Sequence, residues 1–161
     1  MASWGEIETV APALARHARE LFEGHVHKTI ATVRADGSPR ISGIEAKFID
    51  GDLWFGSMPR SRKGADLARD PRFSLHSGSD DPPDWKGDAK LSGRAEEVVD
   101  PVRKEEVFRA MGADPEVVGL DSALYRVDVG ELSVPRLAES GDELAIDWWS
   151  EAGGLHALTR K

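Results

Sequence analysis

The sequence predicts a mainly β protein with a few helices, in which six or seven mostly antiparallel strands form a closed or partly closed barrel. Short segments rich in β-branched and aromatic residues recur along the chain, and Asp-Gly turns join several of them as hairpins. No repeat, low-complexity tract or linker divides the 161 residues, a length in the usual range of one domain. We therefore expect a single domain over residues 1–161.

An amphipathic helix opens the predicted fold within about residues 10–22. Val10, Leu14, His17 and Leu21 recur there at helical spacing between charged residues, and the helix is regular from residue 12. The barrel is expected over about residues 28–150. Its first three strands are joined by turns that contain Asp-Gly, which readily adopts positive φ angles, and they are predicted at 28–34, 39–48 and 53–56.

The later elements are predicted from caps, turns and alternation. Ser61 caps a short helix that ends near residue 69, and Asp100 followed by Pro101 begins a helix to about residue 111. Residues 77–87 are too polar and proline-rich for regular structure, so we expect a loop there. Strands are predicted at 72–76, at 88–99 with a bulge at Gly93, at 125–134 with a bend at Gly130, and at 144–149, before a C-terminal tail at 151–161.

Composition excludes several classes of function. The net charge of −8 disfavours nucleic acid or an anionic membrane as the main partner, because both need a basic protein surface. The chain has no cysteine, which excludes disulfides, thiolate nucleophiles and cysteine metal sites. The N-terminus lacks the basic start and apolar stretch of a secretory signal, and no apolar run is long enough to span a membrane. We expect a cytoplasmic protein that acts on a small molecule.

Cations cluster at the start of the helix that Ser61 caps. Arg60, Arg62 and Lys63 flank this serine where the helix dipole already places about half a positive charge. Cations are unfavourable there unless an anion binds, because helix N–H groups, a hydroxyl and guanidinium groups then converge on one phosphate. The alternative is a solvated basic turn, whose cost of about a few tenths of a kcal/mol is tolerable. The residues alone leave both interpretations open.

A family resemblance extends over about residues 28–99. The motifs that carry it are Thr-Ile-Ala-Thr-Val from Thr29, Asp-Gly-Ser-Pro from Asp36, Gly-Asp-Leu-Trp-Phe from Gly51, Ser-Arg-Lys-Gly-Ala-Asp-Leu from Ser61 and Asp-Pro-Arg from Asp70. This segment resembles the pyridoxamine 5'-phosphate oxidase-like family. The resemblance implies an FMN-binding split β-barrel that forms a homodimer with its cofactors at the interface.

The resemblance also implies which residues surround the cofactor. The family's Ser-Arg-Lys segment holds the FMN phosphate, and the strand before it lines the flavin ring. A family-like dimer would place the loop that contains Trp85 over the partner's cofactor; alternatively, this tryptophan anchors its own loop. The expected cofactor-binding residues are Arg60, Ser61, Arg62, Lys63, Ser57, Ser42, Gly43, Ile44 and Trp85.

The chain departs from the family pattern in two places. It lacks the C-terminal arginine-rich segment that binds substrate in the vitamin oxidases, so we do not expect pyridoxamine 5'-phosphate oxidation. Arg40 lies one position away from the place of a flavin-reaching arginine, and its role stays open. Similar short relatives use the deazaflavin coenzyme F-420, so FMN and F-420 both remain candidates.

These observations predict an oxidoreductase that transfers a hydride or electrons between FMN or coenzyme F-420 and a small organic substrate. Because the cofactor carries that chemistry, no catalytic side chain is assigned. The alternative is a non-catalytic dimeric module that binds or senses flavin with the same residues. His25 and His27 have the spacing of half a metal site, but no third ligand accompanies them, so no metal is expected.

Overall fold

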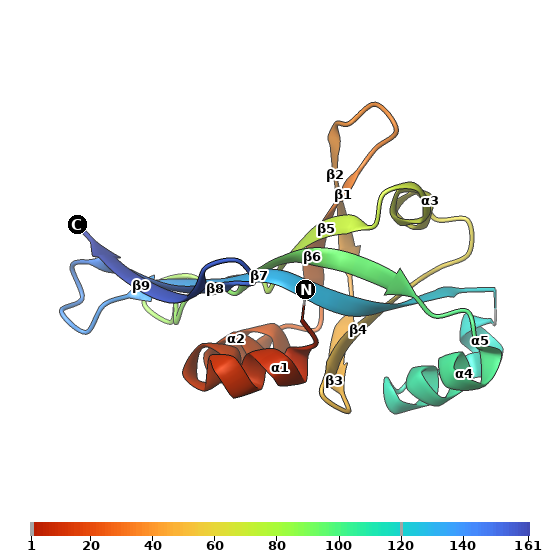
Figure 1. Ribbon diagram of the computed structural model, residues 1–161, viewed down its shortest axis with the longest axis horizontal. Coiled ribbons are helices and arrows are strands. Elements are labelled where there is room, and N and C mark those ends of the chain that lie inside the picture. The colour runs from red at the N-terminus through yellow and green to blue at the C-terminus, as the bar shows by residue number, and fades with distance from the viewer. Residues whose placement is uncertain (1, 120) are drawn as a thin grey trace.

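A computed structural model describes residues 2–119 and 121–161, and its strands are all paired antiparallel (Figure 1). The helices in this part of the chain are α1 (Trp4–Val10), α2 (Pro12–Gly24), α3 (Arg62–Arg69), α4 (Pro101–Ala110) and α5 (Pro115–Val118). The strands are β1 (Lys28–Val33), β2 (Pro39–Ile44), β3 (Ala46–Ile49), β4 (Asp52–Ser57), β5 (Arg72–His76), β6 (Lys90–Glu97), β7 (Ala123–Leu137), β8 (Leu144–Ser150) and β9 (Gly154–Arg160).

The order of the strands forces the sheet to curve. The main path runs β2-β1-β5-β6-β7-β4-β3, while β8 pairs with β7 and β9 pairs with β8. The edge strands β2 and β3 are consecutive in the chain and only Glu45 separates them. Two peptide units span at most about 7 Å, so the two edges of the path must come together at this residue. The sheet therefore closes into a barrel that stays split beside Glu45.

The predicted strand at 39–48 is wrong in one respect, because the structure divides it into β2 and β3. Ile44 and Ala46 are both buried and Glu45 between them is exposed, so the alternation continues unbroken across the division. Only the pairing partner changes, from β1 for Ile44 to β4 for Ala46. Periodicity contains no signal for such a change of partner.

Three further elements were missed: α1, the short helix α5 and β9. Ser3 begins α1 with a capping box, in which its backbone N–H donates to the Glu6 carboxylate at 2.7 Å and its hydroxyl accepts from the Glu6 N–H. The expected C-terminal tail at 151–161 instead contains β9, which pairs along its length with β8. The split strand and β9 raise the expected seven strands to nine among the described residues.

Several other expectations are confirmed. The helix from residue 12, the loop at 77–87 and the helix after Asp100 are present. The bulge is also confirmed, because the pairing of β6 with β7 shifts between Ser92 and Gly93 and skips Gly130. A β-carbon at Gly93 would lie 2.1 Å from the Asp128 carbonyl oxygen, so only glycine fits that crossing.

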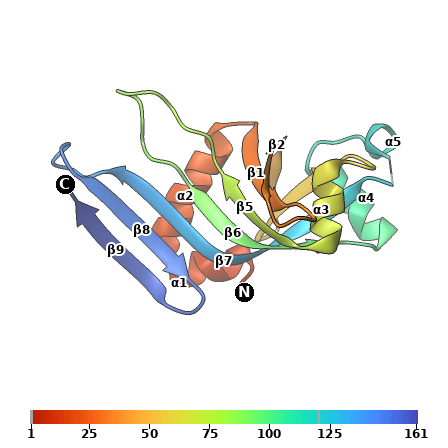
Figure 2. The same cartoon turned by 90° about the horizontal axis from the view of Figure 1, so that it is seen from above.

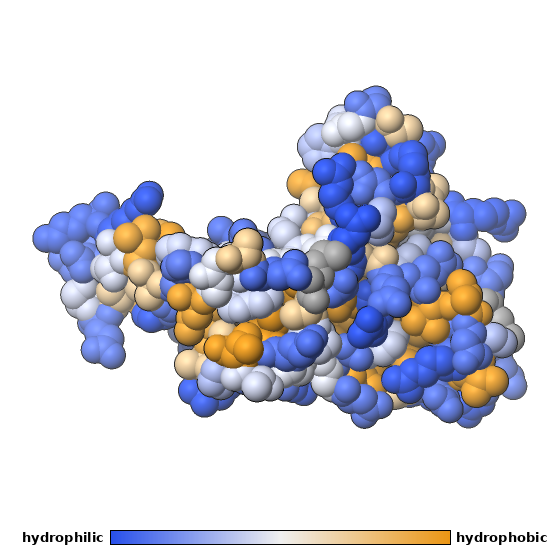
Figure 3. Space-filling view, in the orientation of Figure 1, coloured by the Kyte–Doolittle hydropathy of each residue, from blue (hydrophilic) through white to orange (hydrophobic). Residues whose placement is uncertain are grey.

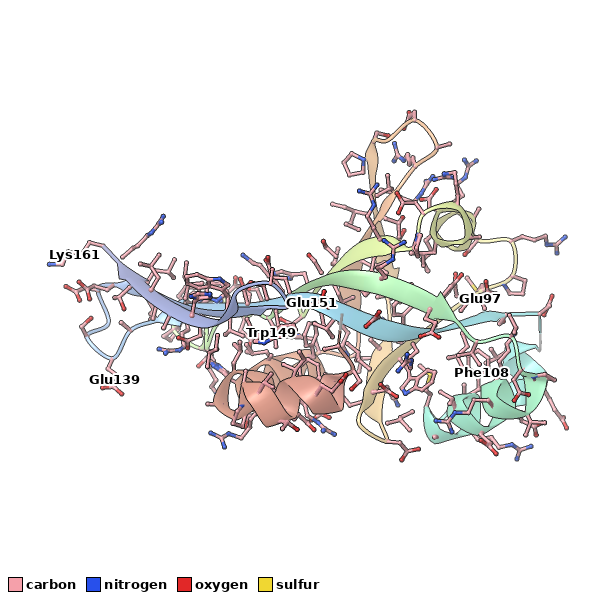
Figure 4. All side chains as sticks on the ribbon, in the orientation of Figure 1. Glu97, Phe108, Glu139, Trp149, Glu151 and Lys161 are labelled. Atoms are coloured by element: carbon pink, nitrogen blue, oxygen red, sulfur yellow. The ribbon has the colours of Figure 1, made fainter. Side chains whose placement is uncertain are left out.

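The helices and the C-terminal hairpin lie at different parts of the barrel. In Figure 1, α1 and α2 lie together on one face of the sheet, where Trp4, Ile7 and Phe22 are fully buried. Figure 2 shows α3, α4 and α5 at one end of the molecule and the β8–β9 hairpin at the other. Trp149 is buried between β8 and the α1–α2 side, as Figure 4 shows, whereas Trp148 stacks on His156 with ring centroids 5.0 Å apart.

A small second core joins α4 to the outside of the barrel. Val107 and Phe108 of α4 are buried against Trp54 and Leu124, separately from the main core. Figure 4 shows Phe108 on the side of α4 that faces the sheet. Figure 3 shows hydrophobic side chains at the surface of this region as well. Helix α4 is thereby held beside β4 and β7. The α4–α5 segment lies next to the split, across from the β2–β3 junction. No helix in the described part of the chain is long and apolar enough to cross a membrane.

Asp66 anchors α3 to the barrel. It is 3% exposed and accepts hydrogen bonds from the Arg40 Nε at 2.6 Å and the Thr32 hydroxyl at 2.9 Å. Arg69 approaches the other carboxylate oxygen at 3.4 Å. The Arg40 hydrogen bond is the main cause that holds the pKa of Asp66 below its ordinary value. This carboxylate links α3 to β1 and β2 and gives Arg40, whose role was open, a structural function.

Changing Asp66 to asparagine (Asp66→Asn) is expected to lower the free energy of unfolding at neutral pH by about 2 kcal/mol, because the charged hydrogen bonds are lost. The pKa of Asp66 is lower in the folded state, so the wild-type advantage is complete above the ordinary value of 3.8 and disappears as the pH falls through the folded value. Urea unfolding at several pH values measures this difference. The exposed Asp142→Asn is the control, and a difference that does not shrink in acid would contradict the assignment.

Candidate cofactor-binding groove

A groove of about 930 Å³ lies beside the split in the barrel. This volume is at the upper end of the range typical of small-molecule sites. One wall comes from the β2–β3 junction, the end of β4 and the start of α3, and the other comes from the α4–α5 segment. The lining residues are His27, Gly43, Ile44, Glu45, Lys47, Gly56, Ser57, Met58, Pro59, Lys63, Phe108, Met111, Gly112, Ala113, Val117, Val118, Gly119, Asp121 and Ser122.

Two serine hydroxyls meet at the start of α3. Ser61 is the N-cap, and its hydroxyl accepts the Gly64 backbone N–H at 3.0 Å. The Ser57 hydroxyl, which is buried at the end of β4, hydrogen-bonds to the Ser61 hydroxyl. A β-carbon at Gly64 would lie 2.9 Å from the Ser61 Oγ and 3.4 Å from the Ser57 Oγ. Glycine therefore lets the first turn of α3 pack directly against the end of β4.

Tyr125 lies under the same helix turn. Its hydroxyl oxygen is 3.8 Å from the position that a Gly64 β-carbon would take, and the residue is only 2% exposed. Burial, aided by the nearby charge of Glu97, raises the pKa of Tyr125 to about 12. The phenol therefore stays neutral at physiological pH and adds no negative charge below this cluster of donors.

Lys63 crosses the split. Its Nζ donates to the Gly43 carbonyl oxygen of β2 at 3.2 Å, which joins the first turn of α3 to the strand on the other side of the gap. An ammonium group has three N–H donors, so this contact leaves the others available to a ligand. Lys63 is the one member of the predicted basic cluster that lines the large groove in the described chain.

The free edge of β2 faces the groove. In an antiparallel strand the N–H and C=O of one residue point to the same side, so the direction of the Gly43 carbonyl also fixes that of its N–H. Gly43 therefore directs both groups away from β1, whereas Ser42 and Ile44 direct theirs toward it. Space is open beside the Gly43 α-carbon, since a β-carbon there would meet nothing within 4 Å. Gly43 offers a backbone donor, and the buried Ile44 side chain offers an apolar surface.

The other predicted residues are not part of this lining. Arg60 is an exposed residue with φ of 58° in the turn before Ser61. Arg62 lines a separate, shallower groove of about 360 Å³ together with Arg34, Arg40 and Arg69. The start of α3 thus has Lys63 on one side and Arg62 on the other. Ser42 lies one residue before the lining segment of β2.

Trp85 lies in the long loop and not in the groove. Its indole N–H donates to Asp88 at 2.9 Å within the same loop, and the residue is half-buried. Within one chain Trp85 therefore anchors its own loop. Of the two histidines considered for a metal, His25 pairs with Asp80 at 3.5 Å, and His27 lies 3.9 Å from Glu45 at the groove. The described residues contain no cluster of three side chains suited to hold a metal ion.

The wall formed by α4 and α5 was missed by sequence reasoning. Phe108 packs close to Gly56 of β4, where an added β-carbon would lie 3.1 Å from the ring. Met111, Val117 and Val118 extend this wall beyond the end of α4. The only signal in the sequence was a helix with apolar residues near its end, and that pattern does not show which strands the helix covers.

Comparisons with known proteins add to this geometry. A family model described as "Pyridoxamine 5'-phosphate oxidase" matches residues 14–129. No curated protein sequence matches the chain. Several solved structures resemble it in fold at low sequence identity. The structure of a heme binding protein from Mycobacterium smegmatis is 22% identical with a TM-score of 0.58, and the match covers 93% of this chain and 59% of that one. The chain thus spans less than two thirds of that protein.

Two other structures are similar over much of their own length. A NimC/NimA family protein from Clostridium acetobutylicum is 14% identical with a TM-score of 0.61, and the match covers 96% of this chain and 97% of that one. An F-420 reductase is 18% identical with a TM-score of 0.52, and the match covers 66% of this chain and 88% of that one. At these identities the structural matches establish the fold alone.

Replacing Gly64 by alanine (Gly64→Ala) is expected to lower the free energy of unfolding by about 1 kcal/mol, although alanine favours helices over glycine. The new methyl group would displace the Ser61 hydroxyl from the helix N-terminus. Gly24→Ala is the matched control, because nothing lies within 4 Å of a β-carbon at that position of α2. Thermal unfolding should show a loss at Gly64 and none at Gly24. Stabilisation by Gly64→Ala would contradict the packing at this turn.

Proposed function

The chain belongs to the pyridoxamine 5'-phosphate oxidase family, and from that premise we propose that it is a flavin-type oxidoreductase whose groove binds FMN. The fold, a mainly antiparallel split barrel, is that of the family. The proposed activity is transfer of a hydride or electron pair between the cofactor and a small organic substrate. Coenzyme F-420 is the alternative cofactor, and the similar fold of an F-420 reductase supports keeping it.

One observation carries the proposal: Lys63, the hydroxyls of Ser57 and Ser61, and the edge of Gly43 converge at the start of α3. A helix N-terminus beside an ammonium group favours a phosphate. The backbone donor of Gly43 lies next to it and suits the polar edge of a ring system. A ligand with a phosphate joined to a planar ring matches this order of groups. Arg60 and Arg62, around the same turn, add positive potential to the phosphate site in this proposal.

The protein's own residues would bind and orient such a cofactor. When bound, the cofactor supplies hydride transfer, in which the substrate gains or loses two electrons and a proton while water supplies or takes the second proton. Lys63 and the serines would fix the phosphate end, and Gly43 with Ile44 would hold one edge and one face of the ring. Phe108 and Met111 on the α4–α5 wall would exclude water from the remaining side.

A binding or sensing module without turnover is the second candidate. The similar protein from Mycobacterium smegmatis is a heme binding protein, which supports a binding function without turnover. The two functions differ in one measurable property. In an enzyme, an organic substrate reoxidises the reduced cofactor with saturation kinetics, whereas a storage or sensing module shows no such dependence on a substrate.

We also propose that the protein is a homodimer with the cofactor at the interface. Met58 after β4 lines the groove, and Ile41 lies on β2 two residues before the lining residue Gly43; each of these large apolar side chains is 75% exposed. Exposed apolar residues next to a binding groove are typical of surfaces that another chain covers. In such a dimer the long loop with Trp85 would extend toward the partner's groove.

Titration of the purified protein with FMN and, separately, with coenzyme F-420 tests the proposed function. One of them is expected to bind saturably, and Lys63→Ala should weaken it by roughly 10-fold or more, because a charge-assisted hydrogen bond contributes about 1.5–3 kcal/mol. The affinity for riboflavin, which lacks the phosphate, should fall much less in the same Lys63→Ala variant. Lys90→Ala, at an exposed lysine of β6, is the control. Binding of neither cofactor would reject the proposal, and unchanged affinity in Lys63→Ala would reject the phosphate site.

Replacing Ile41 by glutamate (Ile41→Glu) is expected to convert the dimer to a monomer, because it buries a charge in the proposed interface. Light scattering after size-exclusion chromatography measures the mass. The control is Val102→Glu, at an exposed valine of α4 away from β2, which should leave the mass unchanged. A wild-type monomer at micromolar concentration, or a dimeric Ile41→Glu protein, would contradict the proposed interface.

A further inference from the structure

Lys47 is a second cation in the groove. It is an exposed residue of β3 whose pairing partner is Trp54 of β4. Its Nζ lies 3.8 Å from the position of a β-carbon on Gly112, just after α4. Lys47 forms no ion pair within residues 2–119 and 121–161, whereas most arginines of the barrel are paired. Its ammonium is therefore available to a ligand.

The two lysines of the groove are well separated. Lys47 lies across from Trp54, whereas the phosphate site begins at Ser57, three residues further along the same strand. A strand rises about 3.3 Å per residue, so the two ends are roughly 10 Å apart. Lys63 is at the Ser57 end, where it contacts Gly43. A ligand at Lys47 would therefore not share the proposed phosphate site.

The surface between the two lysines is largely apolar. Phe108, Met111 and Val118 line the α4–α5 wall, and Ile44 lines the barrel wall opposite. Two acidic residues also line the groove. Glu45 lies 3.9 Å from His27 at the β2–β3 junction, and Asp121 follows α5. The Lys47 end of the groove thus combines apolar side chains with an ammonium group that forms no ion pair among the described residues, and the Glu45 carboxylate of the same groove lies near His27.

A purely structural role for Lys47 is the competing explanation. Gly112 follows the C-terminus of α4, and a cation near a helix C-terminus interacts favourably with its carbonyl groups. That role would make Lys47 contribute to stability and would leave ligand affinity unaffected. The two roles can be separated, because ligands with and without a negative charge respond differently to removal of the lysine.

We propose that Lys47 determines substrate specificity by binding the anionic group of an apolar, elongated substrate such as an aromatic carboxylate or sulfonate. This inference rests on the proposed function, since the cofactor would occupy the Lys63 end and the substrate the Lys47 end. The apolar wall binds the body of the substrate, and the ammonium binds its charged end. Neutral compounds of the same shape gain only the apolar contacts.

A pair of fluorescent probes tests the inference on the full-length protein saturated with FMN. Anilinonaphthalene sulfonate carries a negative charge, and phenylnaphthylamine has nearly the same aromatic body without it. Lys47→Ala should weaken binding of the sulfonate about 10-fold, the usual effect of losing a charge-assisted hydrogen bond, and should leave the neutral probe within twofold. Lys47→Arg should restore sulfonate binding, and Lys90→Ala should change neither.

Three results would overturn the inference. If Lys47→Ala weakens binding of both probes equally, the lysine only supports the α4–α5 wall. Thermal unfolding would then show that the variant is also less stable than the wild type. Unchanged sulfonate binding would exclude contact with the anion. On cofactor-free protein, displacement of bound sulfonate by added FMN would place the sulfonate in the cofactor end. If wild-type protein fails to bind FMN, the proposed function fails, while the two probes on cofactor-free protein still test the role of Lys47.

Discussion

The closure of the sheet at Glu45 is the constraint on which the rest of the structure depends. Because this single residue joins the two edge strands of the path, the sheet must curve until β2 and β3 meet. Away from the junction the edges diverge, and in the described part of the chain no strand pairs with the outer edge of β2, where Lys63 reaches the Gly43 carbonyl. The groove is the space that this incomplete closure leaves, so the binding site results from the topology of the barrel.

The charges around α3 fit the same arrangement. Helix α3 begins with three cations near its positive end, which is unfavourable in isolation. Asp66, buried one turn later, accepts hydrogen bonds from Arg40 and Arg69 and holds the helix against the barrel. Lys63 reaches across the split to Gly43. The fold thus tolerates a local excess of positive charge at the edge of the groove, where an anionic ligand would compensate it.

Part of the site could be predicted from the sequence and part could not. The order Ser61, Arg62, Lys63 after a strand indicated an anion site, and Lys63 does line the groove beside Ser57 and Gly43. Arg62, one residue earlier, lines a different groove because successive helical residues point about 100° apart. The apolar wall of α4 and α5 comes from residues more than forty positions later in the chain, and their position depends on packing against Trp54.

The sequence by itself determined the elements whose causes are local. Turns with Asp-Gly, the caps Ser61 and Asp100 and the bulge at Gly93 depend on neighbouring residues or on one tight crossing, and each formed where expected. Only the tertiary structure decided that one alternating segment is two strands at opposite edges, that the chain end pairs as β9, and that Lys47 and Lys63 share a groove. The physical reason is that pairing partners and walls are chosen by distant segments, while periodicity records only which face of each segment is buried.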